Sequence, residues 1–386
     1  MSPAAPNGLT YETISTAEGF AALGDSWDDL VRAMQRPSPH LLHAWLAAWW
    51  RYFGEGNELA VQAAYRGDKL VGAVPLCVQH RHGVRVLTFL GADQVALADL
   101  LLAKGETDGV CTALVERALA AKYDYADFHG LSGSSRLMKA LGPSRLQLIV
   151  RAEAPVLELN GVDWEAYYAT RLSSKQRALH RRRIRQLSKL GELETTVART
   201  WEELAPALEE AFQLHALRWE GRPDRSDFGT EAGRQFHREA AEAIAKLDVP
   251  RIVTLRLDGR PIAFAYNLAL DGTMHCYRLA FDPELYRFSP GLVNRYDSLE
   301  SAFGEGVTRI EFLGGLERYK VELTDRTEPL HEGLGLADSV AGKAVVSARL
   351  NAVRLRRFAK RSPAIRRFYY EGLAPARRLL RVGGGS

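Results

Sequence analysis

The chain has 386 residues, 46% of them apolar and 25% charged, with a formal net charge of +4. This length is enough for two domains, and the apolar content supports ordinary folded cores. The longest apolar-looking stretch, LLHAWLAAWW, is about half as long as a membrane-spanning helix, so we expect no such helix.

The net charge hides an asymmetry between the C-terminal tail and the rest of the chain. Residues 349–381 hold eleven lysines and arginines and one acid, a net charge of +10, which leaves −6 for the remainder. The basic character therefore belongs mainly to the tail.

The start of the chain and the cysteines indicate a cytoplasmic protein. Residues 1–9 lack the basic start and apolar core of a secretory signal peptide. Cys77, Cys111 and Cys276 are scattered, odd in number and without metal-ligand spacing. We expect buried reduced thiols, no metal site and a cytoplasmic location, with contact to the inner membrane face as an addition.

The first part of the chain predicts helices followed by a sheet. Residues 9–53 carry the apolar and tryptophan anchors of a helix-rich segment. Residues 59–91 predict a three-stranded meander with turns at 66–68 and 81–83. A helix is expected near residues 109–122, followed by a strand around residues 125–129.

A basic helix is expected in the middle of the chain. Residues 173–190 begin with a capping-box pattern, Ser173 and Gln176, and end before Gly191, a natural helix stop. Seven lysines and arginines and no acid lie in this segment. Its basic face is either solvated or binds an acidic partner. Further helices are expected over residues 201–219 and 235–246.

The most informative stretch covers residues 251–315. Three strand-like runs, RIVTLRL, PIAFAYNLAL and MHCYRLAF, are separated by Asp-Gly pairs at 258–259 and 271–272, which favour hairpins. Ser-Pro-Gly at 289–291 then ends the strand pattern, and a helix and a short strand, RIEFL, follow. The start of that helix would offer an anion free N–H groups beside Arg287.

This order of strands, helix and strand occurs twice. The segments YRGDKLVGAVPL and LRLDGRPIAFAYNL can be laid over one another. We therefore predict an α/β (α+β) fold with two tandem copies, each a mixed, mostly antiparallel sheet flanked by helices. The predicted domains are residues 1–155 and 156–340, followed by a basic amphipathic helical tail at 341–386.

The segments LHALRWEG, YRLAFDPELYRFSPG and FLGGLERYK, with the intervening helix, resemble the GNAT acyltransferase superfamily. The resemblance runs from His215 to Lys320, and over about residues 10–335 when a degenerate first copy is included. The chain is most similar to the tandem-GNAT branch labelled cellulose- or polysaccharide-biosynthesis acetyltransferase, which is related to Fem-type transferases.

The resemblance implies an N-acyltransferase with acyl-coenzyme A as co-substrate and no permanently bound cofactor. The donor would be the acyl-CoA thioester or an acyl carrier protein, and the acceptor an amine of a small molecule, sugar or peptide. Direct attack is expected, because no Cys or Ser elbow motif is present. An aminoacyl-tRNA-dependent Fem-like transferase and a non-catalytic GNAT scaffold in envelope-polysaccharide assembly remain alternatives.

The resemblance also implies that the loop before the helix binds the pyrophosphate of coenzyme A. Here that loop supplies Tyr286, Arg287, Ser289 and Gly291, with Ser and Pro where a first glycine is usual. Arg287 would supply charge, and Gly291 would let the backbone approach the ligand or would be a plain turn glycine. Lys320 would pair with a donor phosphate or be solvated. The segment GADQVALADLLLAKGETDG has no comparable turn, so the first copy is expected to have lost donor binding and to shape the acceptor cleft.

Four residues are candidates for acid–base chemistry. Tyr319 lies where the superfamily often keeps a tyrosine acid, or it serves packing. Glu311 would be a base with a raised pKa, or it would point to solvent. His275 on a strand, and His215 on the same helix face as Trp219, are either structural or available for base catalysis, with acceptor recognition as a further role for His215.

The two basic segments suggest partners. The 173–190 helix fits an acidic carrier protein, the adenosine phosphate of the coenzyme or tRNA backbone. Nucleic acid is the least favoured, because the rest of the chain is acidic and no aromatic residues are interleaved with the arginines. The tail, divided into short helices by Pro363 and Pro375, would lie on an anionic membrane or fold back onto the acidic body.

Overall fold

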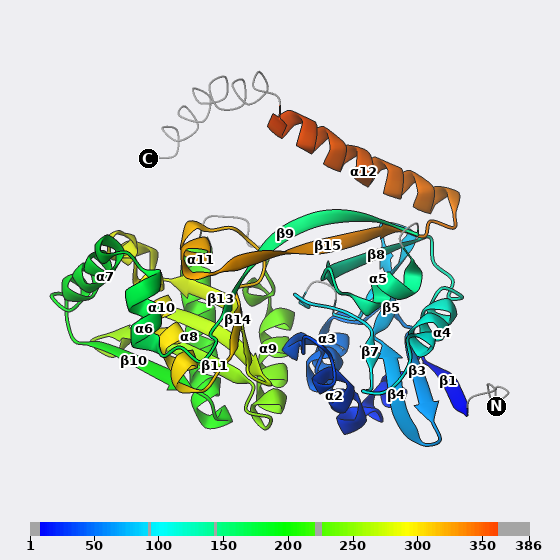
Figure 1. Cartoon of the computed structure of the whole chain (residues 1–386), viewed down its shortest axis with the longest axis horizontal. Helices are drawn as coiled ribbons and strands as arrows, with labels where there is room; N and C mark the ends of the chain where they lie inside the picture. Colours follow the sequence, from blue (N-terminus) through cyan, green and yellow to red (C-terminus); the bar gives the residue numbers. More distant parts are fainter. Residues whose placement is uncertain (1–7, 92–93, 143–144, 221–225, 362–386) are drawn as a thin grey trace.

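The computed structural model describes residues 8–91, 94–142, 145–220 and 226–361, and shows two α/β units joined side by side (Figure 1). Two long strands run across the boundary between the units in this view. The predicted helix breaks at Pro363 and Pro375 lie outside the described residues.

The first unit begins with a strand and a group of helices and continues into hairpins. Its elements are β1 (Leu9–Ile14), α1 (Ala17–Ala21), α2 (Gly24–Arg32), η1 (Pro39–Leu41), α3 (His43–Phe53), β2 (Glu58–Leu59), β3 (Val61–Arg66), β4 (Lys69–Val74), β5 (Leu76–Arg81), β6 (Val84–Phe89), β7 (Leu101–Leu102), α4 (Asp108–Ala118), β8 (Tyr125–Leu131), α5 (Arg136–Leu141) and β9 (Leu146–Glu158).

The predicted meander differs from the structure at one point. Residues 69–81 were expected to form one strand, but Pro75 divides them into β4 and β5. A proline cannot donate a ladder hydrogen bond, so the strand pairing changes there. β4 pairs in a four-stranded sheet of order β1-β3-β4-β7, whereas β5 pairs in the large sheet.

The second unit contains the predicted basic helix and the hairpins after it. Its elements are α6 (Trp164–Arg171), α7 (Ser174–Leu187), β10 (Leu193–Ala198), α8 (Trp201–Trp219), η2 (Asp227–Gly229), α9 (Glu231–Ala245), β11 (Pro250–Leu257), β12 (Arg260–Leu270), β13 (Thr273–Phe281), η3 (Pro283–Phe288), α10 (Pro290–Gly304), β14 (Arg309–Glu311), α11 (Arg318–Leu323) and β15 (Arg326–Gly335). The capping box at Ser173 and Gln176 forms as predicted.

The two units repeat one order of elements, which confirms the prediction of a tandem fold. In the first, β6 pairs in parallel with β8 across α4; in the second, β13 pairs in parallel with β14 across α10. The large sheet has the order β10-β11-β12-β13-β14-β9-β15-β8-β6-β5-β2 and therefore runs through both units.

The strands β9 and β15 hold the two units together. β9 pairs with β14 of the second unit, and β15 pairs with both β9 and β8 of the first. The boundary expected after residue 155 thus falls inside β9. The core is also shared: α3 packs against α9, with the Trp45 and Phe236 ring centroids 5.0 Å apart. All three cysteines are buried.

The tail begins with one helix, α12 (Val340–Arg361), that packs on the first unit. Its residues Val345, Val346, Leu350 and Val353 contact a core cluster under β8 and β15. Arg349 ion-pairs with Asp127 on β8 and with Glu332 on β15. Asp127, Glu332 and nearby His129 could form a cation site, but Arg349 already supplies the positive charge. No helix within the described ranges is long and apolar enough to cross a membrane.

Candidate active site in the second unit

A cleft of about 510 Å³ opens where β13 and β14 separate. The two strands pair in parallel only up to His275 and Glu311, and the rest of β13 pairs with β12. Tyr277 is an extra residue in β13, because Tyr266 pairs with Arg278 and Asn267 pairs with Cys276. Such a bulge increases the local twist and redirects side chains, so it contributes to the opening.

The start of α10 forms one end of the cleft. Ser289 precedes the helix in the left-handed conformation, with φ 54°, and gives no side-chain cap. The first turn contains Pro290, which has no N–H, and Leu292 and Val293 donate their N–H groups to the carbonyl oxygen of Ser289. The N–H of Gly291 therefore remains at the start of the helix, and no acidic residue in the first turn neutralises the helix dipole. Arg287 lies beside it on η3, exposed, with its guanidinium 4.6 Å from the Phe288 ring centroid. This end of the cleft is suited to an anion.

Gly291 lines the cleft and also has a packing role. A Cβ on Gly291 would lie 2.7 Å from Phe281 Cδ1 and 3.3 Å from Leu279 Cδ2. The glycine therefore lets α10 pack closely on β13, and both residues it contacts also line the cleft. Its lack of a side chain shapes the cleft through helix–strand packing.

Tyr319 and Lys320 come to the opposite wall of the cleft from α11. Burial raises the pKa of Tyr319, although the charges of Arg295 and Arg218 oppose this shift, so the phenol stays protonated at neutral pH. Lys320 Nζ lies 3.0 Å from a carboxylate oxygen of Glu317 and 3.0 Å from the carbonyl oxygen of Gly314. Lys320 is therefore paired rather than freely solvated.

Three of the catalytic candidates do not line this cleft. His275 is fully buried, and burial together with the charge of Arg36 lowers its pKa to about 3, so the ring is neutral. His215 is buried on α8, and its Nε2 lies 2.7 Å from Ser226 Oγ. These positions suit structural roles.

Glu311 does not point to solvent, which was one of the two expectations for it. Its carboxylate is completely buried and accepts hydrogen bonds from Nε and Nη2 of Arg36, at 2.6 and 2.5 Å. Arg309 Nε donates a further hydrogen bond at 2.8 Å. A buried carboxylate is held here by two arginines, one of them from the first unit.

The sequence did not indicate most of the basic residues in the cleft. Five basic side chains and one acidic side chain line it: Arg218, Arg278, Arg287, Arg295, Lys320 and Glu317. Arg218 reaches in from α8, where its Nη1 donates to the carbonyl oxygen of Leu279 at 3.1 Å. The four arginines come from four different elements, so no local sequence pattern links them. Only the folded structure shows that they line one cleft.

A buried carboxylate, Asp227, lies next to the cleft residue Arg278. Asp227 accepts hydrogen bonds from Arg278 and from His237 of α9. Burial alone would raise the pKa of Asp227, but the hydrogen bond from His237 and the charge of Arg278 outweigh it and lower that pKa. Tyr277 OH donates to Gln94 Oε1 of the first unit at 3.1 Å. The first unit thus contacts the rim of the cleft.

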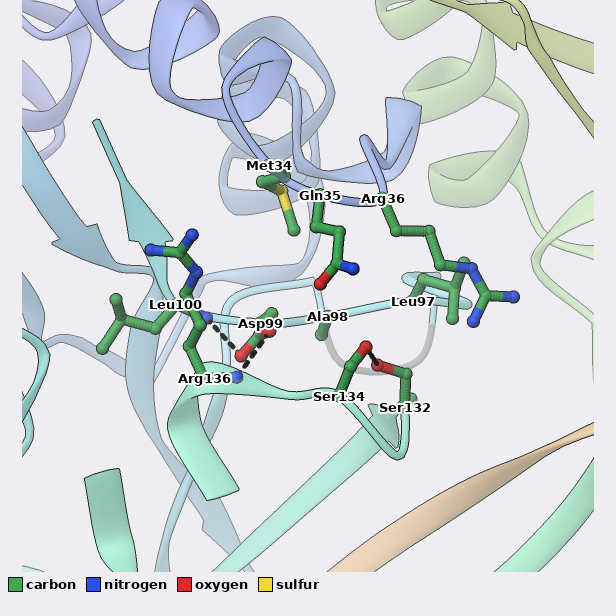
Figure 2. Close-up of a pocket in the computed structure, with 11 residues that line it drawn as sticks. Met34, Gln35, Arg36, Leu97, Ala98, Asp99, Leu100, Ser132, Ser134 and Arg136 are labelled. Carbon is green, nitrogen blue, oxygen red and sulfur yellow. Dashed lines mark hydrogen bonds between the residues drawn. The ribbon is translucent and has the colours of Figure 1, made fainter. Parts of the chain in front are cut away.

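The corresponding opening in the first unit is filled. Leu97, Ala98 and Leu100 are buried, and Ala98 N donates to the carbonyl oxygen of Gly130 on β8 at 3.1 Å. Figure 2 shows what remains, a pocket of about 30 Å³ where Asp99 accepts hydrogen bonds from the N–H groups of Leu100 and Arg136, both at 2.8 Å. The expectation that the first copy has lost donor binding stays a prediction.

The comparisons with known proteins agree with this geometry. Residues 174–321 match the acetyltransferase (GNAT) domain family. That range contains β10 to β14, α10 and the residues that line the cleft. No curated protein sequence matches the chain.

Several solved structures share the fold across both units. The C-terminal domain of a putative lysylphosphatidylglycerol synthetase from Agrobacterium fabrum is 14% identical with a TM-score of 0.55, over 86% of this chain and 96% of that one. FemX is 11% identical with a TM-score of 0.55, over 84% and 96%. A conserved protein of unknown function from Bacteroides thetaiotaomicron is 14% identical with a TM-score of 0.51, over 85% and 99%. The GNAT resemblance is confirmed, whereas the likeness to the polysaccharide-biosynthesis branch stays a prediction.

Proposed function

Residues 174–321 form a GNAT acetyltransferase domain, and from this premise we propose that the chain is an N-acyltransferase. It transfers an acyl group from an acyl-coenzyme A thioester to an amine of a small molecule, sugar or peptide. The donor binds in the cleft of the second unit, and the first unit shapes the acceptor side.

One observation carries this proposal: the uncapped start of α10 and a set of basic residues meet at a cleft between diverging strands. The Gly291 N–H at the positive end of the α10 dipole and the Arg287 guanidinium suit the pyrophosphate of the donor. The backbone of β13 beyond His275 has no partner strand on the β14 side among the described residues. Its N–H groups are therefore placed to polarise a thioester carbonyl.

The transfer needs two proton movements. The amine nitrogen attacks the thioester carbon, the C–N bond forms, the C–S bond breaks, and the thiolate takes a proton from the Tyr319 hydroxyl. Glu317 is the one carboxylate lining the cleft among the described residues, and it accepts the proton of the attacking amine directly or through water. Burial raises the pKa of Cys276, which keeps it a thiol and favours direct attack over a cysteine-bound intermediate.

A thermal-shift titration of the full chain tests the donor class. The ligands are coenzyme A, acetyl-coenzyme A and a long-chain acyl-coenzyme A. A ligand that binds only the native state raises the melting temperature by an amount set by its concentration and affinity. We expect a concentration-dependent rise with at least one thioester. No rise with any of the three would contradict the proposal and favour an aminoacyl-tRNA donor, for which activity is lost on RNase treatment.

A carrier-protein donor is the second candidate, and the exposed face of α7 favours it. Lys175, Arg181, Arg182 and Arg185 are exposed on this helix, which packs against α10 and η3 beside the donor end of the cleft. An acidic carrier docked there would lie next to the cleft that receives its acyl chain.

Charge reversal at α7 distinguishes the two donors. With a carrier-protein donor, Arg181→Glu combined with Arg182→Glu should weaken transfer from the acylated carrier and leave transfer from acyl-coenzyme A unchanged. Arg234→Glu on α9, in a surface ion pair with Glu231, is a matched control. Equal transfer from the carrier by the parent and the α7 variant would exclude this docking site.

A further inference from the structure

The cleft holds one buried arginine that no acid neutralises. Arg295 lies on α10, is 2% exposed and lines the cleft. It forms no ion pair with any residue that the structure describes. Its Nε has no hydrogen-bond partner there, and its Nη1 donates only to a neutral group, the Asn267 amide oxygen, at 3.2 Å.

The neighbours of Arg295 hold it in place without balancing its charge. Asn267 on β12 is fully buried and donates its own Nδ2 hydrogen bond to Ser298 Oγ at 2.9 Å, so its oxygen faces the guanidinium. The Phe312 ring centroid lies 5.9 Å from the guanidinium carbon. The positive charge of Arg295 also acts on Cys276 and Tyr319 in the cleft. It opposes the increase in their pKa values that burial causes.

An arginine in this position implies a missing anion. The guanidinium does not lose its proton in proteins, so burial cannot neutralise it as it can neutralise a lysine. A buried charge without a partner is costly, and it persists in a site where a ligand of opposite charge completes it. The planar, forked donors of arginine match a carboxylate.

Arg295 is also set apart from the donor-phosphate end. It lies five residues beyond Pro290, which corresponds to about 7.5 Å of rise along an α-helix. Its contacts are with β12 and with Phe312 just after β14, on the sheet side of α10. Arg287 and the first turn of α10 are therefore available for the donor phosphates, and Arg295 faces the part of the cleft between β13 and α11.

We propose that Arg295 binds a carboxylate of a reacting group, so that the enzyme selects a carboxylate-bearing substrate. This inference rests on the proposed acyl transfer. The carboxylate belongs either to the transferred acyl group, as in a dicarboxylic acyl-coenzyme A, or to the amine acceptor, as in an amino acid. Both sources present the same chemistry to the guanidinium.

Four pairs of ligands, each differing in one carboxylate, separate these sources: two pairs of donors and two pairs of acceptors. In the donor arm, affinities are measured by calorimetry for malonyl-coenzyme A against butyryl-coenzyme A and for succinyl-coenzyme A against valeryl-coenzyme A. In the acceptor arm, coenzyme A release from acetyl-coenzyme A is followed with alanine against alaninamide and with glutamate against its α-amide. We expect the carboxylate form to be preferred roughly tenfold or more in one arm, as for a charge-assisted hydrogen bond.

Substitution then assigns the preference to Arg295. Arg295→Met should abolish the preference and retain affinity for coenzyme A itself, and Arg295→Lys should restore part of it. Arg251→Met is the matched control, because Arg251 is also buried, at 5% exposure, but pairs with Asp248 and Glu305 away from the cleft. The Arg251→Met variant should keep the preference for carboxylate-bearing ligands, even if the substitution lowers the stability of the protein.

The outcomes separate this inference from the proposed function. Thioester binding with no carboxylate preference in either arm overturns the inference and leaves the acyltransferase proposal intact. A preference that survives in Arg295→Met also overturns it. If Arg295→Met does not fold, the carboxylate preference of the parent protein and its partial retention in Arg295→Lys still test the inference. Absence of all thioester binding contradicts the proposed donor, and the inference falls with it.

Discussion

Arg36 and Glu311 join the two units through a buried two-pronged ion pair. Arg36, 16% exposed, follows α2 of the first unit, and Glu311, fully buried, ends β14 of the second. The two hydrogen bonds measure 2.6 and 2.5 Å, and Arg36 Nη1 also lies 2.7 Å from Glu328 on β15. Because β14 pairs with β13, which lines the cleft, this ion pair connects the position of the first unit to the active site.

Arg36→Met should destabilise the protein markedly. Loss of Arg36 removes two of the three hydrogen bonds to the buried Glu311 carboxylate and leaves Arg309 as its cationic partner, so we expect the free energy of unfolding to fall by about 2–4 kcal/mol. Urea denaturation measures it. The double variant Arg36→Met with Glu311→Met should be less affected than Arg36→Met alone, because it removes both charges.

A surface pair provides the control for this prediction. Arg51, 68% exposed, pairs with Glu239 across the same two units at 2.9 Å. Its replacement by Met should cost less than about 1 kcal/mol, as for exposed ion pairs. Equal losses for Arg36→Met and Arg51→Met would show that burial does not strengthen the Arg36–Glu311 link.

Arg287→Ala should weaken donor binding without loss of fold. Arg287 is exposed on η3 and has no ion-pair partner among the residues described, so its removal breaks no ion pair. We expect the affinity for coenzyme A to fall roughly tenfold, with a smaller difference at high salt, since the contact is with an exposed phosphate. Isothermal calorimetry at two salt concentrations measures both effects.

Arg318→Ala is the comparison for Arg287→Ala. Arg318 is 90% exposed on α11 and does not line the cleft. Its variant should bind coenzyme A as the parent does. If Arg287→Ala and Arg318→Ala bind alike, the pyrophosphate does not contact Arg287.

Tyr319→Phe should lower the rate of transfer while donor affinity is retained. Loss of a general acid typically reduces the rate by a factor of about 10² or more. The acid acts in its protonated form, so in the parent the rate should fall as pH rises through the pKa of Tyr319. Burial raises that pKa, which places the fall above the usual tyrosine range.

The pH profile of the variant tests the assignment. Tyr319→Phe should lack the fall at high pH, because the group that titrates has been removed. A variant that keeps the same alkaline limb, or the parental rate, would assign the proton donor to another group.

The second half of the fold could be predicted because its signals are local. The Asp-Gly turns at 258–259 and 271–272, the Ser-Pro-Gly stop and the capping box at Ser173 each act within a few residues, and β11 to β14 and α7 formed as expected. The resemblance to the GNAT superfamily implied Arg287, Tyr319 and Lys320 as site residues, and the structure places all three in one cleft.

Other features depend on contacts between distant residues, which sequence pattern does not record. β9 and β15 cross between the units, so no boundary in composition marks them. Glu311 appeared to be a candidate base because its partner, Arg36, lies 275 residues away in the chain. No sequence pattern singles out Arg295, and only the packing of α10 on β12 shows that it is buried without an acid partner among the described residues.

The exposed end of α12 provides a last prediction, on membrane contact. The first part of this helix packs on the first unit through Val346 and Leu350, so the tail folds back in part. Further along, Leu355 and Phe358 are 67% and 64% exposed, in a segment rich in arginine. Exposed apolar residues among cations favour an anionic lipid surface.

Co-sedimentation with vesicles tests this contact. The full chain should pellet with vesicles rich in phosphatidylglycerol at low salt and not with vesicles of phosphatidylcholine alone. Leu355→Ser with Phe358→Ser should reduce the bound fraction, because two apolar side chains no longer insert. The same exchange at Leu217, 45% exposed on α8, should not reduce it. Equal binding by the tail variant and the parent would leave electrostatic attraction as the cause, and no binding by either would exclude α12 as a membrane contact.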